Sequence, residues 1–485
     1  METSKQLVEG VTRRSFVGAG MAAGAAAMGM VGASGADAPG LAFADVSAVV
    51  ASGSEAAYDL LIKGGNVFGG DQGVDVGIKD GLIAAVGELS ADDAAQVIDA
   101  ESRLVSPSFC DTHTHLDKAF QMEYPEYRDK VRELEAEYYA GDEVDYGYPV
   151  CGGSETFLMD ELKQQNDEDG LREIVRTRIS RACDMAIANG TGLIKTNNTW
   201  GPLSVEVVKG LKQDYAGKID LKNIVIYTDN TEVGDACTMT ANALEDYCAS
   251  GVVDFLGGYF DGDYGYDSID GLFELASKYS LPIDVHVLET DVPLLKPFDY
   301  FLDKTLEYGM QGRVTFGHLT ALDAPGIDED ELAAVIEKAA ETQVNVTSLA
   351  SCNMYLMGRK AANPVRRGPT RLKQLMAAGV NCCYASDNIR DAWRPYGNAD
   401  MMQEAMVAAH CMQYAFPDEL ETIWQMGTYN AAKNALVDGY GVSEGCKADL
   451  VVLDAPSADL ALINQAKRLY VVKSGVVVAK DGALV

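Results

Sequence analysis

The feature that most constrains the fold is an alternation of short apolar runs with amphipathic helical stretches through the middle of the chain. Each run has the length of a strand buried on both faces, which is typical of a parallel sheet covered by helices. One helical stretch, 171–189, has apolar residues at helical spacing. We expect the strands at 104–109, 192–196, 223–228, 252–257, 282–287, 313–317, 343–348 and 379–386. Eight such units predict an α/β fold, a (β/α)₈ TIM barrel over residues 104–440.

Short strand-like pieces precede and follow the barrel segment. Those in residues 56–103 and 441–485 are separated by Gly-Gly, Asp-Gly and Ser-Gly turns. Neither set is long enough to bury a core of its own. We therefore expect the two chain ends to pair into one small β-sandwich domain beside the barrel.

Residues 1–44 have the pattern of an export signal. Arg13 and Arg14 precede a run of Gly, Ala, Met and Val, and Ala42-Phe43-Ala44 offers a cleavage site. Paired arginines before a weakly apolar stretch are typical of a twin-arginine signal, which implies contact with that export machinery. A retained membrane anchor is the alternative. The run is poor in Leu and Ile, so it would be a poor permanent span.

Charge and cysteine usage exclude several classes of function. The formal net charge is −34, which repels phosphate backbones and argues against a nucleic-acid or anionic-membrane partner. The ten cysteines form no C-x-x-C pair, so neither a zinc knuckle nor a thioredoxin-like motif is expected. A small-molecule substrate fits this composition, and both a monomer and a homo-oligomer remain open.

Histidines mark one end of the predicted barrel. The chain has five histidines, and four of them, His113, His115, His286 and His318, end or follow an expected strand. Barrel enzymes place their chemistry at the carboxyl ends of the strands. Four of five histidines at that face favour a metal centre over isolated core or surface histidines.

Four residues form the expected metal site. His113 and His115 are two positions apart, so on an extended strand both imidazoles point to the same face. His286 ends the fifth expected strand and Asp387 follows the eighth. Three imidazoles and one carboxylate bind one divalent ion and leave a position open for water.

Two further residues are candidates for the proton chemistry of a hydrolase. Glu289 lies three positions after His286, near the metal but not among its ligands. An activated water needs a proton acceptor and a leaving nitrogen needs a donor, and one carboxyl can do both. His318 is expected to orient the attacking water or to stabilise developing charge, and Asp387 is expected to help activate the water.

These motifs resemble those of the amidohydrolase superfamily, most closely its cytosine deaminase branch. The resemblance covers nearly everything after about Asp59. Its segments are His113-Thr-His-Leu-Asp-Lys118, His286-Val-Leu-Glu289, Val314-Thr-Phe-Gly-His318-Leu-Thr-Ala321, Gly358-Arg359 with Arg366-Arg367-Gly368, and Asp387-Asn-Ile-Arg-Asp391-Ala-Trp393-Arg-Pro-Tyr-Gly-Asn398. The resemblance implies a mononuclear Fe²⁺ or Zn²⁺ aminohydrolase that splits a C–N bond of a small nitrogen heterocycle or related amide.

The chain departs from the cytosine deaminase pattern where that family reads its substrate. Asp229 stands near the position of the family's pyrimidine-reading glutamine, and Lys195-Thr-Asn-Asn198 replaces its Arg-Thr-His stretch. Asn388 replaces a second acidic residue. Cytosine itself is therefore in doubt. By position, Asp229, Asn197, Asn198 and Trp393 are the candidates for substrate binding.

Two other functions are weighed against this one. A binuclear cyclic amidase, like a dihydropyrimidinase, commonly uses a carboxylated lysine, but residues 255–259 at the fourth strand contain none. An exported binding protein without turnover would not need Glu289 and Asp387. Both alternatives are therefore less favoured than the deaminase.

The arginine pair gives a test of the export hypothesis. Replacing Arg13 and Arg14 with lysine should leave the protein in the cytoplasm, because the export receptor reads the arginine pair itself. Cell fractionation with immunoblotting measures this. Unchanged export of the double variant would point to another secretion route.

Overall fold

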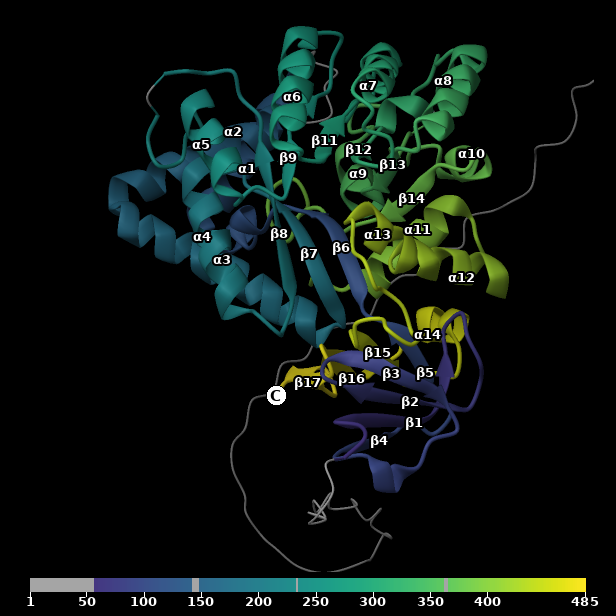
Figure 1. Cartoon of the computed structure of the whole chain (residues 1–485). Coiled ribbons are helices and arrows are strands. Elements are labelled where there is room, and N and C mark those ends of the chain that lie inside the picture. The colour runs from purple at the N-terminus through teal and green to yellow at the C-terminus, as the bar shows by residue number, and fades with distance from the viewer. Residues whose placement is uncertain (1–55, 142–147, 233, 362–364) are drawn as a thin grey trace, which may run out of the picture. The chain divides into compact units, whose positions relative to one another are not determined.

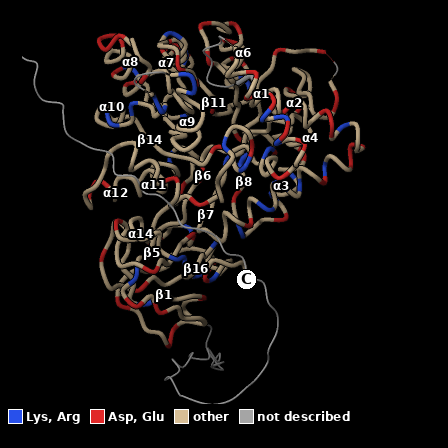
Figure 2. Tube along the Cα trace, turned by 180° about the vertical axis from the view of Figure 1, so that it is seen from behind, with Lys and Arg blue, Asp and Glu red and all other residues tan. Residues whose placement is uncertain are grey.

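A computed structural model describes residues 56–141, 148–232, 234–361 and 365–485. The expected signal, 1–44, lies outside these residues. None of the described helices is long and apolar enough to cross a membrane. Acidic residues occur along the outer helices and along the chain-end strands alike (Figure 2).

The middle of the chain forms the expected barrel of parallel strands. Its main strands are β6 (Phe109–Thr114), β7 (Thr191–Asn197), β8 (Asp220–Ile226), β9 (Phe255–Gly257), β11 (Ile283–Val287), β12 (Val314–His318), β13 (Asn345–Ser348) and β14 (Asn381–Tyr384). They pair in chain order from β6 to β14, and the short β10 (Tyr259–Phe260) adds to β11. The prediction of a TIM barrel is confirmed.

The first and last barrel strands meet through backbone hydrogen bonds. Thr114 and Asp387 form a parallel bridge. The Asp387 amide donates to the His113 carbonyl at 2.9 Å, and the His115 amide donates to the Asp387 carbonyl at 2.9 Å. Below this bridge, the buried Asp111 carboxylate accepts hydrogen bonds from the Ser386 amide at 3.0 Å and its hydroxyl at 2.5 Å. This closure brings the two ends of the barrel segment to one place.

Helices surround the barrel (Figure 1). They are α1 (Pro125–Ala140), α2 (Tyr148–Gln165), α3 (Glu168–Ala188), α4 (Gly201–Asp214), α5 (Ala241–Ser250), α6 (Tyr266–Tyr279), α7 (Lys296–Glu307), α8 (Glu329–Glu341), α9 (Ala350–Leu356), α10 (Leu372–Ala377), α11 (Met401–Met412), α12 (Pro417–Met426), α13 (Tyr429–Asn434) and α14 (Ala458–Asn464). Their apolar faces pack inward: Phe298 and Phe301 of α7 contact Phe316 of β12 edge-on, with ring centroids 4.9 and 5.5 Å apart.

The two chain ends build a separate sheet. Its strands are β1 (Leu60–Val67), β2 (Val74–Lys79), β3 (Leu82–Gly87), β4 (Val97–Asp99), β5 (Leu104–Pro107), β15 (Leu450–Leu453), β16 (Arg468–Lys473), β17 (Val476–Lys480) and β18 (Ala483–Leu484). The order is β18-β17-β16-β15-β5-β1-β2-β3, with β4 on β1. The antiparallel pair β5–β15 joins the N-terminal and C-terminal parts. The chain ends therefore share one sheet, as predicted.

One expected strand belongs to two different sheets. Residues 104–109 were expected to form the first barrel strand, but Leu104–Pro107 pairs with β15 in the chain-end sheet and the barrel begins at Phe109. The Ser108 amide donates to the Asp449 carbonyl, whereas the Phe109 amide donates to Gly190 beside β7. The chain thus changes sheets at Ser108. Residues 104–109 together have the length of one strand and are buried throughout, so neither length nor burial reveals such a change.

The barrel closure can be tested through Ser386. Ser386→Ala removes the hydroxyl hydrogen bond to the buried Asp111 carboxylate. We expect the free energy of unfolding of the metal-free protein to fall by about 1–3 kcal/mol, the cost of leaving a buried polar group short of a partner. Denaturant titration measures it. Thr422→Ala is the control, since its hydroxyl bonds a carbonyl at an exposed position of α12, and it should change the value by less than about 0.5 kcal/mol.

Candidate active site

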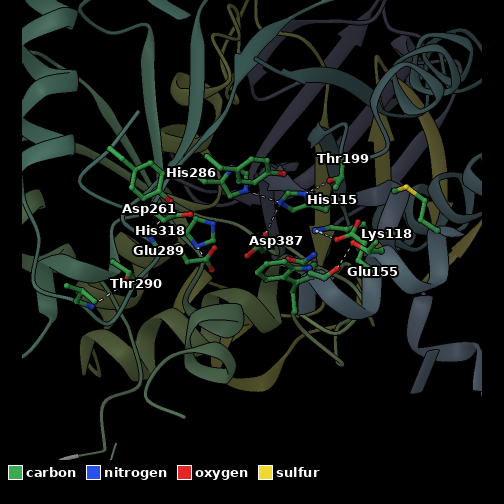
Figure 3. Close-up of a pocket in the computed structure, with 18 residues that line it drawn as sticks. His115, Lys118, Glu155, Thr199, Asp261, His286, Glu289, Thr290, His318 and Asp387 are labelled. Atoms are coloured by element: carbon green, nitrogen blue, oxygen red, sulfur yellow. Dashed lines mark hydrogen bonds and ion pairs between the residues drawn. The ribbon is translucent and has the colours of Figure 1, made fainter. Parts of the chain in front are cut away.

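A cavity of about 820 Å³ opens where the barrel strands end. Its walls come from the residues that follow six of the barrel strands and from helix α2 (Figure 3). The lining residues are His115, Lys118, Gly152, Glu155, Thr156, Met159, Thr199, Tyr259, Asp261, Tyr264, His286, Glu289, Thr290, Val292, His318, Asp387, Asn388 and Trp393. Parallel barrels place ligands at this face, so the cavity is the candidate active site.

Four buried side chains converge at the floor of this cavity. The Nε2 atom of His286 lies 3.0 Å from Nε2 of His113 and 3.0 Å from Nε2 of His115. The Asp387 Oδ1 atom is 3.4 Å from Nε2 of His115 and 3.8 Å from that of His113. One donor atom from each of these residues lies within 4.8 Å of all the others. The structure therefore brings together the four predicted metal ligands.

This arrangement fits one divalent metal ion. Nitrogen ligands about 2.0–2.1 Å from a tetrahedral ion lie about 3.3 Å from one another, close to the separations of the His and Asp donor atoms. A metal ligand must be an unprotonated imidazole. Burial, together with nearby positive charge, lowers the pKa of His115 and of His286 well below the usual value, so both rings are neutral. The donor set is that of zinc or ferrous iron sites.

Neighbouring groups orient two of the imidazoles. The His115 Nδ1 atom lies 3.0 Å from the hydroxyl of Thr199, which follows β7. The Nδ1 atom of His113 lies 3.8 Å from the buried carboxylate of Asp284, two residues before His286 on β11. A side chain at Gly317 would place its Cβ 3.0 Å from Cε1 of His113, so glycine leaves room for that ring. Such surroundings fix which nitrogen faces the ion.

The backbone is strained at two positions of the site. Asp387 has φ of +62° and His318 has φ of +69°, in the left-handed region that non-glycine residues rarely adopt. Each lies where a barrel strand ends and its side chain turns into the cavity (Figure 3). Strain of about 1–3 kcal/mol persists only where the surroundings enforce it. Here the Thr114–Asp387 bridge enforces the conformation of Asp387.

Glu289 and His318 form a buried pair beside the metal ligands. His318 Nδ1 lies 3.1 Å from Oε1 of Glu289, and the Asn353 amide donates to the same oxygen at 2.9 Å. Burial alone would lower the pKa of His318, but the carboxylates of Glu289, Asp387 and Asp261 raise it to about 9. In the metal-free protein these carboxylates favour the protonated form of His318, whose Nε2 atom is unpartnered among the described residues.

A second carboxyl group supports Glu289. Asp261, directly after β10, accepts a hydrogen bond from the Glu289 amide at 2.8 Å. Burial and the nearby Glu289 carboxylate raise the pKa of Asp261 to about 7. The wall around Glu289 thus holds a second carboxyl group, that of Asp261, which exchanges its proton near neutral pH.

The four expected substrate-binding residues have different positions. Trp393 lines the cavity. Asp229 is exposed after β8, with Ser268 donating to it at 3.4 Å. Asn197 is buried and donates to the Thr114 carbonyl, and Asn198 is buried and donates to the Ile224 carbonyl. Asp229, Asn197 and Asn198 are not among the residues that line the cavity, so of the four expected residues Trp393 is the one that lies in its wall.

Several polar residues of the cavity were not expected from the sequence, among them Lys118, Glu155, Thr199, Tyr259 and Asp261. Lys118 ends the His113–Lys118 motif, and Thr199, Tyr259 and Asp261 follow barrel strands, so position alone could have indicated them. The position of Glu155 in the sequence does not indicate that it lines the cavity, because it neither belongs to a motif nor follows a barrel strand. It comes from α2, a helix inserted between the first barrel strand and its α3 helix.

Comparison with known proteins gives the family. The model of the "Amidohydrolase family" matches residues 235–479, half of the chain. The chain is 27% identical over 438 residues to N-isopropylammelide isopropyl amidohydrolase of a Pseudomonas species, covering 88% of this chain and 99% of that protein. It is 29% identical over 414 residues to pterin deaminase of Rhizobium rhizogenes, covering 81% of this chain and 87% of that protein.

The fold is shared with solved structures. 5-Methylcytosine deaminase of Klebsiella pneumoniae, liganded with phosphonocytosine, superimposes with a TM-score of 0.72 at 24% identity, over 87% of this chain and 98% of the other. The N-isopropylammelide isopropylaminohydrolase of Burkholderia multivorans gives 0.67 at 25% identity, over 88% and 99%. These relatives are hydrolases of C–N bonds, as the motifs predicted. With the matched family model and the convergent His and Asp cluster, the chain belongs to the amidohydrolase family.

Proposed function

We propose that this protein is a metal-dependent deaminase that hydrolyses the bond between a ring carbon and an amino nitrogen of a small heterocycle. The observation that carries the proposal is the juxtaposition of two groups in one cavity. One is the cluster of His113, His115, His286 and Asp387, and the other is the buried Glu289–His318 pair. The cluster suits a divalent ion, Fe²⁺ or Zn²⁺, and the pair suits proton transfer.

The chain's own residues have separate tasks in this proposal. A bound divalent ion supplies Lewis acidity and lowers the pKa of water. Glu289 accepts a proton from the attacking water and delivers it to the leaving nitrogen. His318, held protonated by Glu289, donates from Nε2 to the substrate atom on which negative charge develops. Asp387 accepts a hydrogen bond from the water and so orients it.

The substrate class rests on the relatives and on the cavity. The similar proteins act, by their names, on an ammelide, a pterin and a methylcytosine, all nitrogen heterocycles. The cavity of about 820 Å³ is large enough for a one- or two-ring compound, and Trp393 offers a flat face for stacking.

We further propose that the chain is exported by the twin-arginine pathway. The support is the Arg13-Arg14 pair and the Gly- and Ala-rich run that follows it.

Metal content is the first test. We expect one tightly held divalent ion per chain, because His113, His115, His286 and Asp387 supply one complete ligand set. Elemental analysis of the purified protein gives the count. A second group, Glu289 with Cys352 and Asp387, could also hold an ion. Two ions per chain would therefore favour a binuclear amidase and contradict the mononuclear assignment.

The second test separates binding from chemistry. Glu289→Gln keeps the shape of the side chain but removes its proton exchange. Metal content should be unchanged, and release of ammonia from an accepted heterocycle should fall by about two to four orders of magnitude. His286→Ala deletes a ligand, so metal and activity should be lost together.

The two variants also show how the assignment could be wrong. If Glu289→Gln loses metal as readily as His286→Ala, Glu289 is a ligand. If Glu289→Gln keeps near-normal turnover, the proton passes through another group, and Asp261 becomes the leading candidate because of its position beside Glu289.

A further inference from the structure

On the side of the metal cluster opposite Glu289 and His318, the cavity wall carries a buried pair of opposite charges (Figure 3). Lys118 is 4% exposed and Glu155 is 8% exposed, and both line the cavity. Their Nζ and Oε2 atoms are 3.7 Å apart, too far for a hydrogen bond. Buried charges are costly unless they are bonded. Because Lys118 and Glu155 are close but not hydrogen-bonded to each other, each can still form a hydrogen bond with a ligand.

The surroundings of Lys118 favour its protonated form. Burial would lower its pKa, but the neighbouring Glu155 and Asp391 carboxylates raise it above the usual value. No described residue accepts a hydrogen bond from this ammonium, which lies over the Trp393 ring, 5.0 Å from its centroid. Burial raises the pKa of Glu155, whereas Lys118 and the side chains of Trp393 and Trp200 lower it, and its Oε1 atom makes no hydrogen bond of standard geometry with a described residue. The wall thus presents a donor and an acceptor side by side.

Both groups are held in place by the surrounding structure. Lys118 ends the short 3₁₀ helix Leu116–Lys118. The preceding Asp117 carboxylate fixes this turn, because it accepts bonds from the Trp200 amide at 2.9 Å and the Ser204 hydroxyl at 2.8 Å. Glu155 is carried by α2, which the Cys151 thiol ties to the Ala392 carbonyl at 3.3 Å.

The adjoining aromatic face is fixed in the same way. Asp391 accepts hydrogen bonds from the backbone amides of Trp393 and Arg394, at 2.9 and 3.0 Å, and from the Asn388 side chain at 2.6 Å. The loop that carries Trp393 is therefore built around a buried carboxylate. Trp393 thus presents an aromatic ring in the same part of the cavity as Lys118 and Glu155.

A donor beside an acceptor matches one kind of ligand edge. In a cyclic amide, the carbonyl oxygen and the adjacent ring N–H lie about 2.2 Å apart, as the C=O and C–N bond lengths require. Two hydrogen bonds that diverge from this edge would end on atoms separated by roughly the 3.7 Å seen between Lys118 and Glu155. An edge with two N–H donors would meet the ammonium unfavourably.

We propose that Lys118 and Glu155 form a specificity subsite that reads a cyclic amide edge of the substrate, with Lys118 donating to the ring carbonyl and Glu155 accepting from the adjacent ring N–H. This deepens the proposed function and rests on it for the reaction. The substrate class is then an amino-substituted oxo-heterocycle, with the amino group at the metal and the amide edge at the subsite.

A binding experiment tests the subsite without turnover. Calorimetry on the metal-loaded protein compares uracil and the two-ring lumazine, each with its 1,3-dimethyl derivative, which lacks the ring N–H groups. We expect at least one parent compound to bind at least about tenfold more tightly than its dimethyl derivative. Glu155→Gln and Lys118→Met should weaken the parent by about 10- to 100-fold, the value of one hydrogen bond to a charged group. Glu155→Gln should leave the dimethyl derivative within about twofold.

The controls separate the subsite from structural effects and from the reaction. Glu245→Gln, in the exposed pair with Lys278, should bind all four ligands as the unaltered protein does, and thermal melting checks that every variant folds. Glu289→Gln should retain the preference for the parent compound while losing ammonia release, so failure of the proposed reaction appears separately. Equal binding of parent and dimethyl compounds, no binding of either, or an unchanged preference in Glu155→Gln would overturn the proposal.

Discussion

The backbone bridge between Thr114 and Asp387 is the constraint on which the site depends. A barrel of separate strands presents its carboxyl ends around a ring, and the first and last strands become neighbours only on closure. Here the closing hydrogen bonds run through the candidate metal ligands themselves, from the Asp387 amide to the His113 carbonyl and from the His115 amide to the Asp387 carbonyl. Closure of the barrel therefore also sets the relative positions of the side chains in the candidate metal site. A change that loosens the bridge would also separate the imidazoles from the carboxylate.

Buried pairs of oppositely charged side chains are a second feature of the structure. Asp284 is fully buried against the Lys195 ammonium and close to His113, and Arg394 is paired with Glu404 beneath the loop of Trp393. Such pairs add little net stability, because desolvation offsets much of their attraction. Breaking one partner is costly, however, so each pair holds its neighbours to a single arrangement. The positions of the side chains in the candidate site are therefore fixed by groups that do not themselves line the cavity.

The sequence predicted the parts of the site that follow from strand periodicity. His113, His115, His286, His318 and Asp387 were found because parallel strands bring their carboxyl ends together, and Glu289 because it follows a ligand closely. Glu155 could not be found in this way, since the position of an inserted helix depends on tertiary packing. Asp229 was expected at the substrate because it follows a strand, but it is exposed and does not line the cavity, since the residue after a strand can face either the cavity or solvent. The change of sheet at Ser108 was not predicted, because residues 104–109 have the length of one strand and are buried throughout.

The shared chain-end sheet has a consequence for how the molecule is made. Leu104 pairs with Leu453, so strand β5 can pair with β15 only when almost the entire polypeptide has left the ribosome. Until then β1, β2, β3 and β5 form a partial sheet with an unpaired edge, and such edges are where nascent chains associate wrongly. Contacts this distant in sequence also slow folding, because a long loop must close first. The barrel, whose neighbouring strands follow one another in the chain, can assemble during synthesis, and the chain-end sheet is completed after it.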